Sequence, residues 1–381
     1  MKLMLSAGEA SGDNYGAMLL RELRKYGSVE AFGLGGEQLL AEGCDLTVNA
    51  HEVAAVGITE IVRHLPRLYS SYRKLVRALQ QRRPDVLLLI DFPDINFKLA
   101  RHAHRLGISV VFFVSPQLWA WKPWRLRLVK RYVTRMLVIF PFEEQFYRGR
   151  EVDAEFVGHP LADLPMPSIT REAFASQHKL NPLKPWIALL PGSRKGEVRL
   201  NLPEIAHAAA LLGDSYEYVL PVASTLCREF VASHVPATLT KVNFVAADQA
   251  RGALFHARAS IVASGTATVE AALMGNPFVV VYRVSPLTYA IGQRLIKVSH
   301  YAMANLIAGR EIVPELIQSN FTAENVAAQM RQLLPDSAQR NQMIEDLAQV
   351  RRQLKRSEGA MDAIAHAAAI IRQLCGSAIR G

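Results

Sequence analysis

The chain has 381 residues, of which 50% are apolar and 20% are charged, and this composition excludes a disordered or collagen-like chain. The length predicts about two domains. Lysine and arginine number 44 against 34 aspartate and glutamate, and the formal charge of +10 favours anionic partners such as phosphates, acidic lipid or nucleic acid.

The cysteines, Cys44, Cys227 and Cys375, lie far apart and form no paired motif. They indicate neither a disulfide framework nor a zinc site, and a reducing cytosol fits them best. The first apolar run is too short for a signal peptide, and no run reaches about 18 apolar residues. We therefore expect a cytoplasmic protein that does not span a membrane.

In the first half, short apolar runs alternate with longer amphipathic stretches, which is typical of strands and crossover helices in a parallel sheet. The predicted strands are residues 3–6, 30–34, 86–90, 109–114, 136–139 and 155–157. The predicted helices are residues 14–26, 61–82 and 97–106. Continuous apolar strands of this kind are buried on both faces, so the fold class is α/β.

The domain boundary is predicted in the segment 159–167, where three prolines stiffen the chain without forming an element. This gives an N-terminal domain of residues 1–165 and a C-terminal domain of residues 166–381. Strands follow at 186–190, 217–221, 241–245, 259–263 and 278–282, and the tail after Phe321 is predicted to be helical. We expect two doubly wound Rossmann-like domains in series, with ligands at the strand ends.

The strongest local motif is PGSR, which follows the predicted strand 186–190. Gly192 and Ser193 would expose backbone amides at a helix N-terminus, and Arg194 could bind phosphate oxygens with its guanidinium. A diphosphate is the ligand that this chemistry favours. A helix-capping turn with a solvated arginine is the alternative.

A second motif, SGTAT, follows the buried run ASIVA and opens a helix. The amides and hydroxyls of Ser264, Gly265 and Thr266 could contact phosphate, and Glu270 could accept hydrogen bonds from a ribose diol. Two such loops together are harder to explain by capping alone. No Walker loop or GxGxxG motif accompanies them, which disfavours an ATPase or a dinucleotide enzyme.

In the first half, Asp91 comes directly after the apolar strand 86–90, at the edge where ligands of such sheets bind. Partial desolvation there could make its carboxylate a general base. Alternatively, Asp91 or Asp94 caps the next helix, and the cap is preferred for Asp94. A metal-binding pair is a third interpretation, but one strand end supplies too few ligands to argue for it.

Other residues of this half are candidates for an acceptor site. Glu9, Ser11 and Asp13 lie in a glycine-containing turn after the first strand, where a simple helix-capping role for Asp13 is the alternative. Trp119 follows the strand 109–114 and could form a sugar or acyl surface, or simply pack in the core. His159, at the predicted boundary, could be a polar group of the site or a hydrogen-bonded hinge residue.

The segment 61–83 contains seven lysine or arginine residues and no acid, with apolar residues interleaved at helical spacing. Such a basic amphipathic helix suits an anionic membrane surface, and Arg67, Arg73, Lys74 and Arg77 are the residues predicted to face it. Nucleic acid is not favoured, because no recognised binding motif accompanies the charge. A solvated basic face is the remaining alternative.

With these segments in order, the chain resembles the lipid-A-disaccharide synthases, glycosyltransferase family 19 of Gram-negative bacteria. The similar blocks are GEASGD at 8–13, D-x-P-D-x-N at 91–96, SPQLWAW at 115–121, LLPGSR at 189–194, SGTAT-x-E at 264–270 and NLIAGRE at 305–311. The resemblance implies a GT-B fold of two facing Rossmann-like domains with a helical C-terminal tail. It also implies transfer of 2,3-diacylglucosamine from UDP-2,3-diacylglucosamine to 2,3-diacylglucosamine 1-phosphate (lipid X), which gives the β-1,6-linked disaccharide 1-phosphate and UDP.

The resemblance further implies roles for individual residues. Asp91 would deprotonate the acceptor 6-hydroxyl for an inverting displacement, and Arg194 with both glycine loops would stabilise the leaving diphosphate without a metal or cofactor. Glu270 is assigned to the ribose, and Asn305 to the nucleotide or diphosphate. Because both substrates carry acyl chains, the enzyme would act peripherally at the inner face of the inner membrane.

Two alternatives to this activity remain, and the oligomeric state, including a homodimer, stays open. Another UDP-sugar-dependent GT-B transferase or epimerase would share the nucleotide half, although the basic helix argues against the soluble-substrate epimerase. A non-catalytic nucleotide-sugar-binding regulator would have no need of Asp91.

Overall fold

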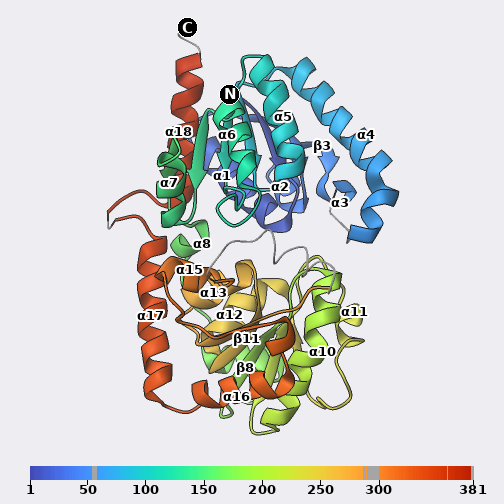
Figure 1. The fold of residues 1–381 in the computed structure, drawn as a ribbon, viewed down its shortest axis with the longest axis vertical. Coiled ribbons are helices and arrows are strands. Elements are labelled where there is room, and N and C mark those ends of the chain that lie inside the picture. The colour runs from blue at the N-terminus through green and yellow to red at the C-terminus, as the bar shows by residue number, and fades with distance from the viewer. Residues whose placement is uncertain (54–57, 286–288, 290–299, 358, 379–381) are drawn as a thin grey trace. The chain divides into compact units, whose positions relative to one another are not determined.

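The computed structural model describes residues 1–53, 58–285, 289, 300–357 and 359–378. The chain divides into two compact units, which are called here the first and the second unit. The first consists of Met1–Asp163 together with Leu354–Gly381, and the second of Leu164–Gln353. Each unit is built on one parallel sheet packed with helices (Figure 1).

The first unit contains a seven-stranded sheet in the order β3-β2-β1-β4-β5-β6-β7. Its strands are β1 (Lys2–Ala7), β2 (Glu30–Gly35), β3 (Asp45–Asn49), β4 (Val86–Ile90), β5 (Ser109–Phe113), β6 (Arg135–Val138) and β7 (Ala154–Phe156). The predicted strands are confirmed to within one residue at each end, whereas the edge strand β3 was missed. Strand β4 is fully buried, as expected for a strand covered on both faces.

The helices of the first unit are α1 (Ala10–Arg24), α2 (Glu37–Ala41), α3 (Ala50–Val53), α4 (Ile58–Arg82), α5 (Pro93–Arg105), α6 (Leu126–Tyr132), α7 (Pro141–Arg148), α8 (Pro160–Asp163) and α18 (Ala363–Ala378), with the 3₁₀ turn η1 (Pro123–Arg125). The predicted helices are confirmed, but they begin three or four residues earlier than expected. In α5 this is because Pro93 starts the helix, where its missing N–H has no intrahelical partner to lose.

The second unit contains a six-stranded parallel sheet in the order β10-β9-β8-β11-β12-β13. Its strands are β8 (Trp186–Leu190), β9 (Glu217–Pro221), β10 (Asn243–Val245), β11 (Ala259–Ala263), β12 (Phe278–Tyr282) and β13 (Glu315–Ile317). Its helices are α9 (Arg171–His178), α10 (Lys195–Leu212), α11 (Arg228–Ala232), α12 (Ala250–His256), α13 (Thr266–Leu273), α15 (Met303–Ala308), α16 (Ala323–Leu333) and α17 (Ala338–Leu354), with short 3₁₀ turns η2 (Ala247–Gln249) and η3 (Gln318–Asn320). The tail after Phe321 is helical, as predicted, and the edge strand β13 was missed.

The last helix differs from the sequence-based domain assignment. Residues 166–381 were expected to form one domain, but α18 belongs to the first unit, where it packs against α1 (Figure 1). Oδ2 of Asp163 accepts a hydrogen bond from the N–H of Ala363 over 2.8 Å, and His366 Nε2 lies 3.0 Å from Glu155 Oε1. The other boundary falls between Asp163 and Leu164, two residues before the predicted one.

In each sheet the strands that come next in the chain lie on one side of the first strand, and the later strands lie on its other side. β1 pairs with β2 on one side and β4 on the other, and β8 pairs with β9 and β11. In open α/β sheets this switch point opens a crevice at the carboxyl ends of the two inner strands, and ligands bind there. The residues after β1 and β4, and after β8 and β11, are therefore the first place to look for function.

Candidate active site

In the second unit, both glycine motifs lie at the switch point. PGSR follows β8 and SGTAT follows β11, and these strands pair with Leu190 opposite Val262. Gly192 has φ of +117°, and a Cβ added there would lie 2.5 Å from Glu197 Oε2, so the turn requires glycine. The structure thus brings together the two loops that the sequence placed about 70 residues apart.

The amides of the PGSR loop bind a carboxylate from the same turn. Oε2 of Glu197 accepts from the N–H of Ser193 over 2.9 Å and from the N–H of Arg194 over 3.2 Å. Nη1 of Arg194 donates to Oε1 of Glu197 over 3.1 Å, although the arginine side chain remains 58% exposed. The structure therefore shows the capping alternative, and the donors predicted to bind a diphosphate are occupied here by the Glu197 carboxylate.

The SGTAT turn starts α13 and is held from outside its own helix. Gly265 is the N-cap residue with φ of +147°, and Thr268 Oγ1 donates back to its carbonyl over 2.7 Å. Ser264 Oγ donates to the carbonyl of Tyr301 over 3.3 Å. Gly265 and Thr266 are exposed, so the start of α13 is accessible to a ligand.

Glu270 lies one turn into α13 and is mostly buried. Burial raises the pKa of its carboxyl group, and the charge of Arg251 opposes that rise. Nη2 of Arg251 also donates to the carbonyl of Pro165 over 2.9 Å. Glu270, which was predicted to bind the ribose, therefore lies near Arg251, and Arg251 binds the backbone close to the boundary between the two units.

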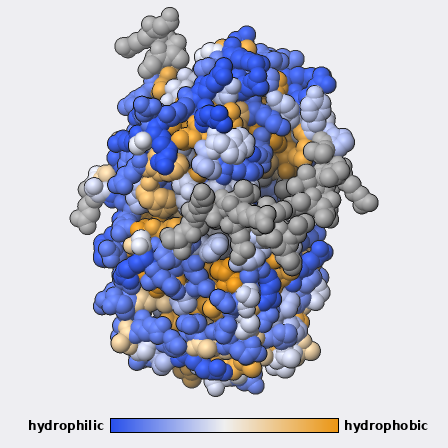
Figure 2. All heavy atoms as spheres, in the orientation of Figure 1, coloured by the Kyte–Doolittle hydropathy of each residue, from blue (hydrophilic) through white to orange (hydrophobic). Residues whose placement is uncertain are grey.

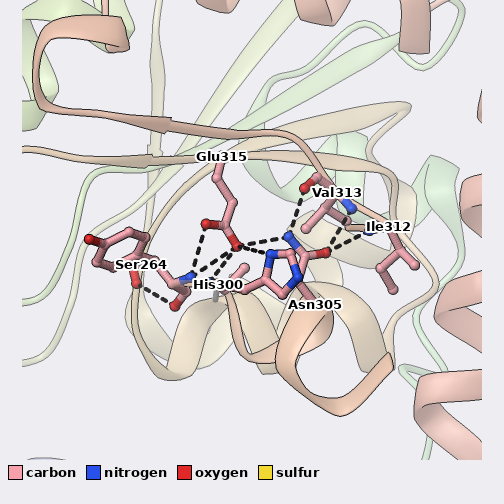
Figure 3. Close-up of polar contacts among 8 residues, drawn as sticks. Ser264, His300, Asn305, Ile312, Val313 and Glu315 are labelled. Atoms are coloured by element: carbon pink, nitrogen blue, oxygen red, sulfur yellow. Dashed lines mark hydrogen bonds and ion pairs between the residues drawn. The ribbon is translucent and has the colours of Figure 1, made fainter. Parts of the chain in front are cut away.

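Asn305 lies in the same region but is fully buried (Figure 3). Its Nδ2 donates to the carbonyl of Val313 over 2.9 Å and to Glu315 Oε1 over 2.7 Å, and its Oδ1 accepts from the N–H groups of Ile312 and Val313. These bonds use both amide hydrogens and both oxygen lone pairs. The predicted contact with the nucleotide or diphosphate is thus not favoured, because the side chain is saturated by its own loop.

In the first unit, Asp91 follows β4 with φ of +45°, and Phe92 follows with φ of +48°. Left-handed geometry at two successive non-glycine residues is costly and is found at functional turns. The turn is held by Asn96, whose Nδ2 donates to the carbonyl of Asp91 over 2.7 Å and whose Oδ1 accepts from Ser6 Oγ. Asn96 therefore holds the backbone of this turn.

The capping alternatives for the two aspartates are not confirmed. Helix α5 has Phe92 as its N-cap residue, so neither aspartate occupies the N-cap position. Asp94 instead forms an ion pair with Arg125. Asp91 is half-buried and lies where the general-base interpretation requires it, at the carboxyl end of β4 beside the end of β1.

The turn after β1 lies beside Asp91 and contains Glu9, and Ser11 follows in the first turn of α1; both residues are half-buried. A Cβ at Gly8 would lie 2.4 Å from the Phe92 ring, so this turn and the Asp91 turn pack closely. Asp13 has a different role from either prediction. It is buried, and its carboxylate accepts from the N–H groups of Gly36, Gln38 and Leu39 at the start of α2.

His159 is also a structural residue rather than a polar group of the site. It is 1% exposed, burial lowers its pKa to about 3, and its Nδ1 accepts from the N–H of Leu161. Its ring packs against Phe140 and Tyr15. The hinge interpretation is therefore the better one, because a neutral buried imidazole with this environment is not presented to a ligand.

Trp119 is half-buried and has a partner that sequence reasoning missed. Its Nε1 donates to Oε1 of Glu143 over 3.0 Å, and its ring packs edge-on against Phe142. Glu143 is 1% exposed, and burial raises the pKa of its carboxyl to about 8. Its position three residues after Phe140 could have indicated a helix cap, but no local signal pairs it with Trp119.

The basic helix α4 presents the predicted cations to solvent. Arg67, Arg73, Lys74 and Arg77 are all exposed. In Figure 2 hydrophilic residues cover most of the first unit, with hydrophobic patches between them. Nζ of Lys74 lies 3.9 Å from Glu52 Oε2 of α3, so an acid from a neighbouring helix relieves part of the charge. Within the described residues, no helix is long and apolar enough to cross a membrane.

The described residues also contain no group of three or more His, Cys, Asp or Glu side chains arranged to hold a metal ion.

Two Rossmann-like units in one chain, with glycine turns at the switch point of the second, define the GT-B class of fold. Solved structures support this class. A UDP-GlcNAc 2-epimerase from Neisseria meningitidis bound to UDP-GlcNAc aligns with a TM-score of 0.64 at 13% identity, covering 99% of this chain and 100% of that one. MurG of Acinetobacter baumannii aligns with a TM-score of 0.59 at 14% identity, covering 98% and 99%.

Sequence relatives identify the family within this class. The model of the lipid-A-disaccharide synthetase family matches residues 3–370. Lipid-A-disaccharide synthase of Acidobacterium capsulatum is 57% identical over 345 residues, covering 87% of this chain and 86% of that protein. The synthase of Koribacter versatilis is 52% identical over 357 residues, covering 93% and 94%. The chain therefore belongs to the lipid-A-disaccharide synthase family and is a glycosyltransferase of lipid A disaccharide synthesis.

Proposed function

We propose that this enzyme transfers 2,3-diacylglucosamine from UDP-2,3-diacylglucosamine to the 6-hydroxyl of 2,3-diacylglucosamine 1-phosphate. The products are the β-1,6-linked disaccharide 1-phosphate and UDP. The observation that carries the proposal is the pairing of β8 with β11, which brings the PGSR and SGTAT loops together in a chain of this family.

On the donor side, Arg194 and the amides near Ser193 contact the diphosphate together with Ser264, Gly265 and Thr266. In this role the diphosphate takes the place of the Glu197 carboxylate, whose bonds support the proposal because the same donors already hold two anionic oxygens. Negative charge grows on the diphosphate as the sugar leaves, and preorganised donors stabilise that charge most in the transition state. Glu270 accepts hydrogen bonds from the ribose hydroxyls.

On the acceptor side, Asp91 takes the proton of the 6-hydroxyl as its oxygen attacks the anomeric carbon. The new C–O bond forms opposite the bond to UDP, the electron pair of the broken bond leaves with the diphosphate, and the configuration inverts. The position of Asp91 at the carboxyl end of the buried strand β4, where ligands of such sheets bind, supports this role. Of the residues predicted to bind the acceptor, Glu9 and Ser11, at the start of α1, are the ones that we still propose for this role.

Neither a metal nor a cofactor is assigned a part in this reaction, because Arg194 and the backbone donors supply the positive potential that the leaving group needs. Because both substrates carry acyl chains, the enzyme has to act at a membrane surface. The exposed cations of α4 support peripheral binding to an anionic leaflet, the inner face of the inner membrane.

The experiment is incubation of the purified protein with both substrates, in buffer and in excess EDTA, followed by mass spectrometry. We expect the disaccharide 1-phosphate and UDP in equal amounts under both conditions. Activity that EDTA abolishes and Mg²⁺ restores would contradict the metal-independent mechanism. UDP release without disaccharide, or UDP-sugar binding without turnover, would exclude the synthase reaction and favour an epimerase or a regulator.

A further inference from the structure

Glu315, the first residue of β13, makes a set of contacts that none of the proposed roles explains (Figure 3). Its side chain is 12% exposed. The carboxylate accepts from the N–H of Tyr301 over 2.9 Å, from the N–H of Ala302 over 2.9 Å and from Asn305 Nδ2 over 2.7 Å. Glu315 therefore fixes the chain where it enters α15.

This segment in turn holds the SGTAT turn. The carbonyl of Tyr301 accepts the hydrogen bond from Ser264 Oγ, and helices α13 and α15 are in contact. Tyr301, His300 and Glu315 also line a surface hollow of about 350 Å³. Glu315 thus connects the sheet, through β13, to a residue proposed to contact the diphosphate.

The contacts require a carboxylate rather than any polar side chain. Oε1 accepts from Tyr301, Ala302 and Asn305, and Oε2 accepts from Tyr301. A glutamine would place an NH₂ group where one of these oxygens now accepts, and a buried N–H would then face a donor. The isosteric change should therefore release the segment without removing volume.

We propose that Glu315 is a positioning residue of the donor site: it fixes the backbone of Tyr301, whose carbonyl accepts the Ser264 hydroxyl hydrogen, and so holds the SGTAT turn and the start of α13 in place for the diphosphate of the UDP-sugar. This inference rests on the proposed function for the identity of the donor. Asn305 belongs to the same arrangement, because it binds both Glu315 and the loop before β13.

The test compares Glu315→Gln, Ser264→Ala and the double variant with the wild-type protein. Glu324→Gln, an exposed glutamate of α16, is the matched control. UDP binding is measured by calorimetry, and KM for donor and for acceptor is measured separately. We expect Glu315→Gln to weaken UDP binding about tenfold and to raise the donor KM similarly, with the acceptor KM unchanged.

The double variant distinguishes a route through Ser264 from a general effect. If Glu315 acts through the Ser264 hydroxyl, the double variant should bind UDP with the same affinity as whichever single variant binds it more weakly. Losses that multiply, an unchanged UDP affinity in Glu315→Gln, or equal losses for donor and acceptor would each overturn the inference. Should Glu315→Gln not fold, unchanged UDP binding in Ser264→Ala would overturn it. A wild-type protein that does not bind UDP would instead refute the proposed function, and this inference with it.

Discussion

The indole N–H of Trp119 donates to a carboxyl oxygen of Glu143 over 3.0 Å, in a place where that carboxyl is almost completely buried. Burial raises the pKa of Glu143 to about 8, so the folded protein holds a proton there that the unfolded chain releases near its ordinary pKa of 4.5. The folded state binds more protons in this window, and stability therefore falls as the pH rises from about 4.5 to 8.

Replacing Glu143 by glutamine should flatten this dependence, because glutamine keeps an oxygen for Trp119 and does not titrate. Between pH 7 and 8 the wild-type protein should lose up to roughly 1.4 kcal/mol per pH unit relative to the variant. His159 does not interfere, since it is neutral in both states above its ordinary pKa of 6.5. Thermal midpoints at several pH values measure this, with exposed Glu37→Gln as control, and parallel curves for wild type and Glu143→Gln would refute it.

Asp91→Asn should lower kcat by at least about a hundredfold and leave UDP binding intact, because asparagine keeps the size of the side chain and removes its basicity. Asparagine tolerates the left-handed backbone at this position, so the turn should persist. Asp94→Asn, three residues on and exposed, is the matched control and should stay within a few-fold of wild type. Near-normal turnover of Asp91→Asn would remove this residue from the general-base role.

Arg194→Ala should weaken UDP binding and also lower kcat, because charge on the diphosphate increases as the sugar departs. An effect of about tenfold on the dissociation constant is expected for one charge-assisted contact at an exposed site. Arg199→Ala, further along α10, serves as control. If Arg194→Ala changed only the thermal midpoint, its contact with Glu197 would be a helix cap and nothing more.

The triple variant Arg67→Glu, Arg73→Glu, Arg77→Glu should bind anionic vesicles more weakly than wild type, with binding that falls as salt rises. Lys74 is left unchanged because it already lies near Glu52. A second-unit triple with the same charge change, Arg228→Glu, Arg331→Glu, Arg352→Glu, is the control. Vesicle flotation at two salt concentrations measures both, and equal flotation of the two triples would refute a specific role for α4.

The sequence predicted the elements whose identity is set locally. Strand β4 is a continuous apolar run and β11 is interrupted only by Ser260, and the motifs that follow them fall at the carboxyl edge once the sheet order is known. Strands β3, with sequence DLTVN, and β13, with ELI, lie at sheet edges and are only partly buried. Their sequences show no clear strand pattern because an edge strand is only partly buried and does not need a continuous apolar run.

What the sequence could not predict depends on partners far along the chain. Asp13 was predicted to be an acceptor-site candidate, with capping of its own helix as the alternative, whereas its partners lie more than twenty residues later at the start of α2. The burial of Asn305 and His159 likewise results from tertiary packing that polar character does not reveal. Residue type and motif position therefore located the site, but they did not separate residues that could touch a ligand from residues that hold the loops.

The packing of α18 on α1 has a consequence for synthesis. All of the second unit lies between Leu164 and Gln353, so a growing polypeptide completes it before α18 has left the ribosome. The first unit, which begins earlier, must wait with part of α1 uncovered until its final helix emerges. A chain truncated near residue 353 would thus contain all of the second unit, but its first unit would lack the helix that packs on α1.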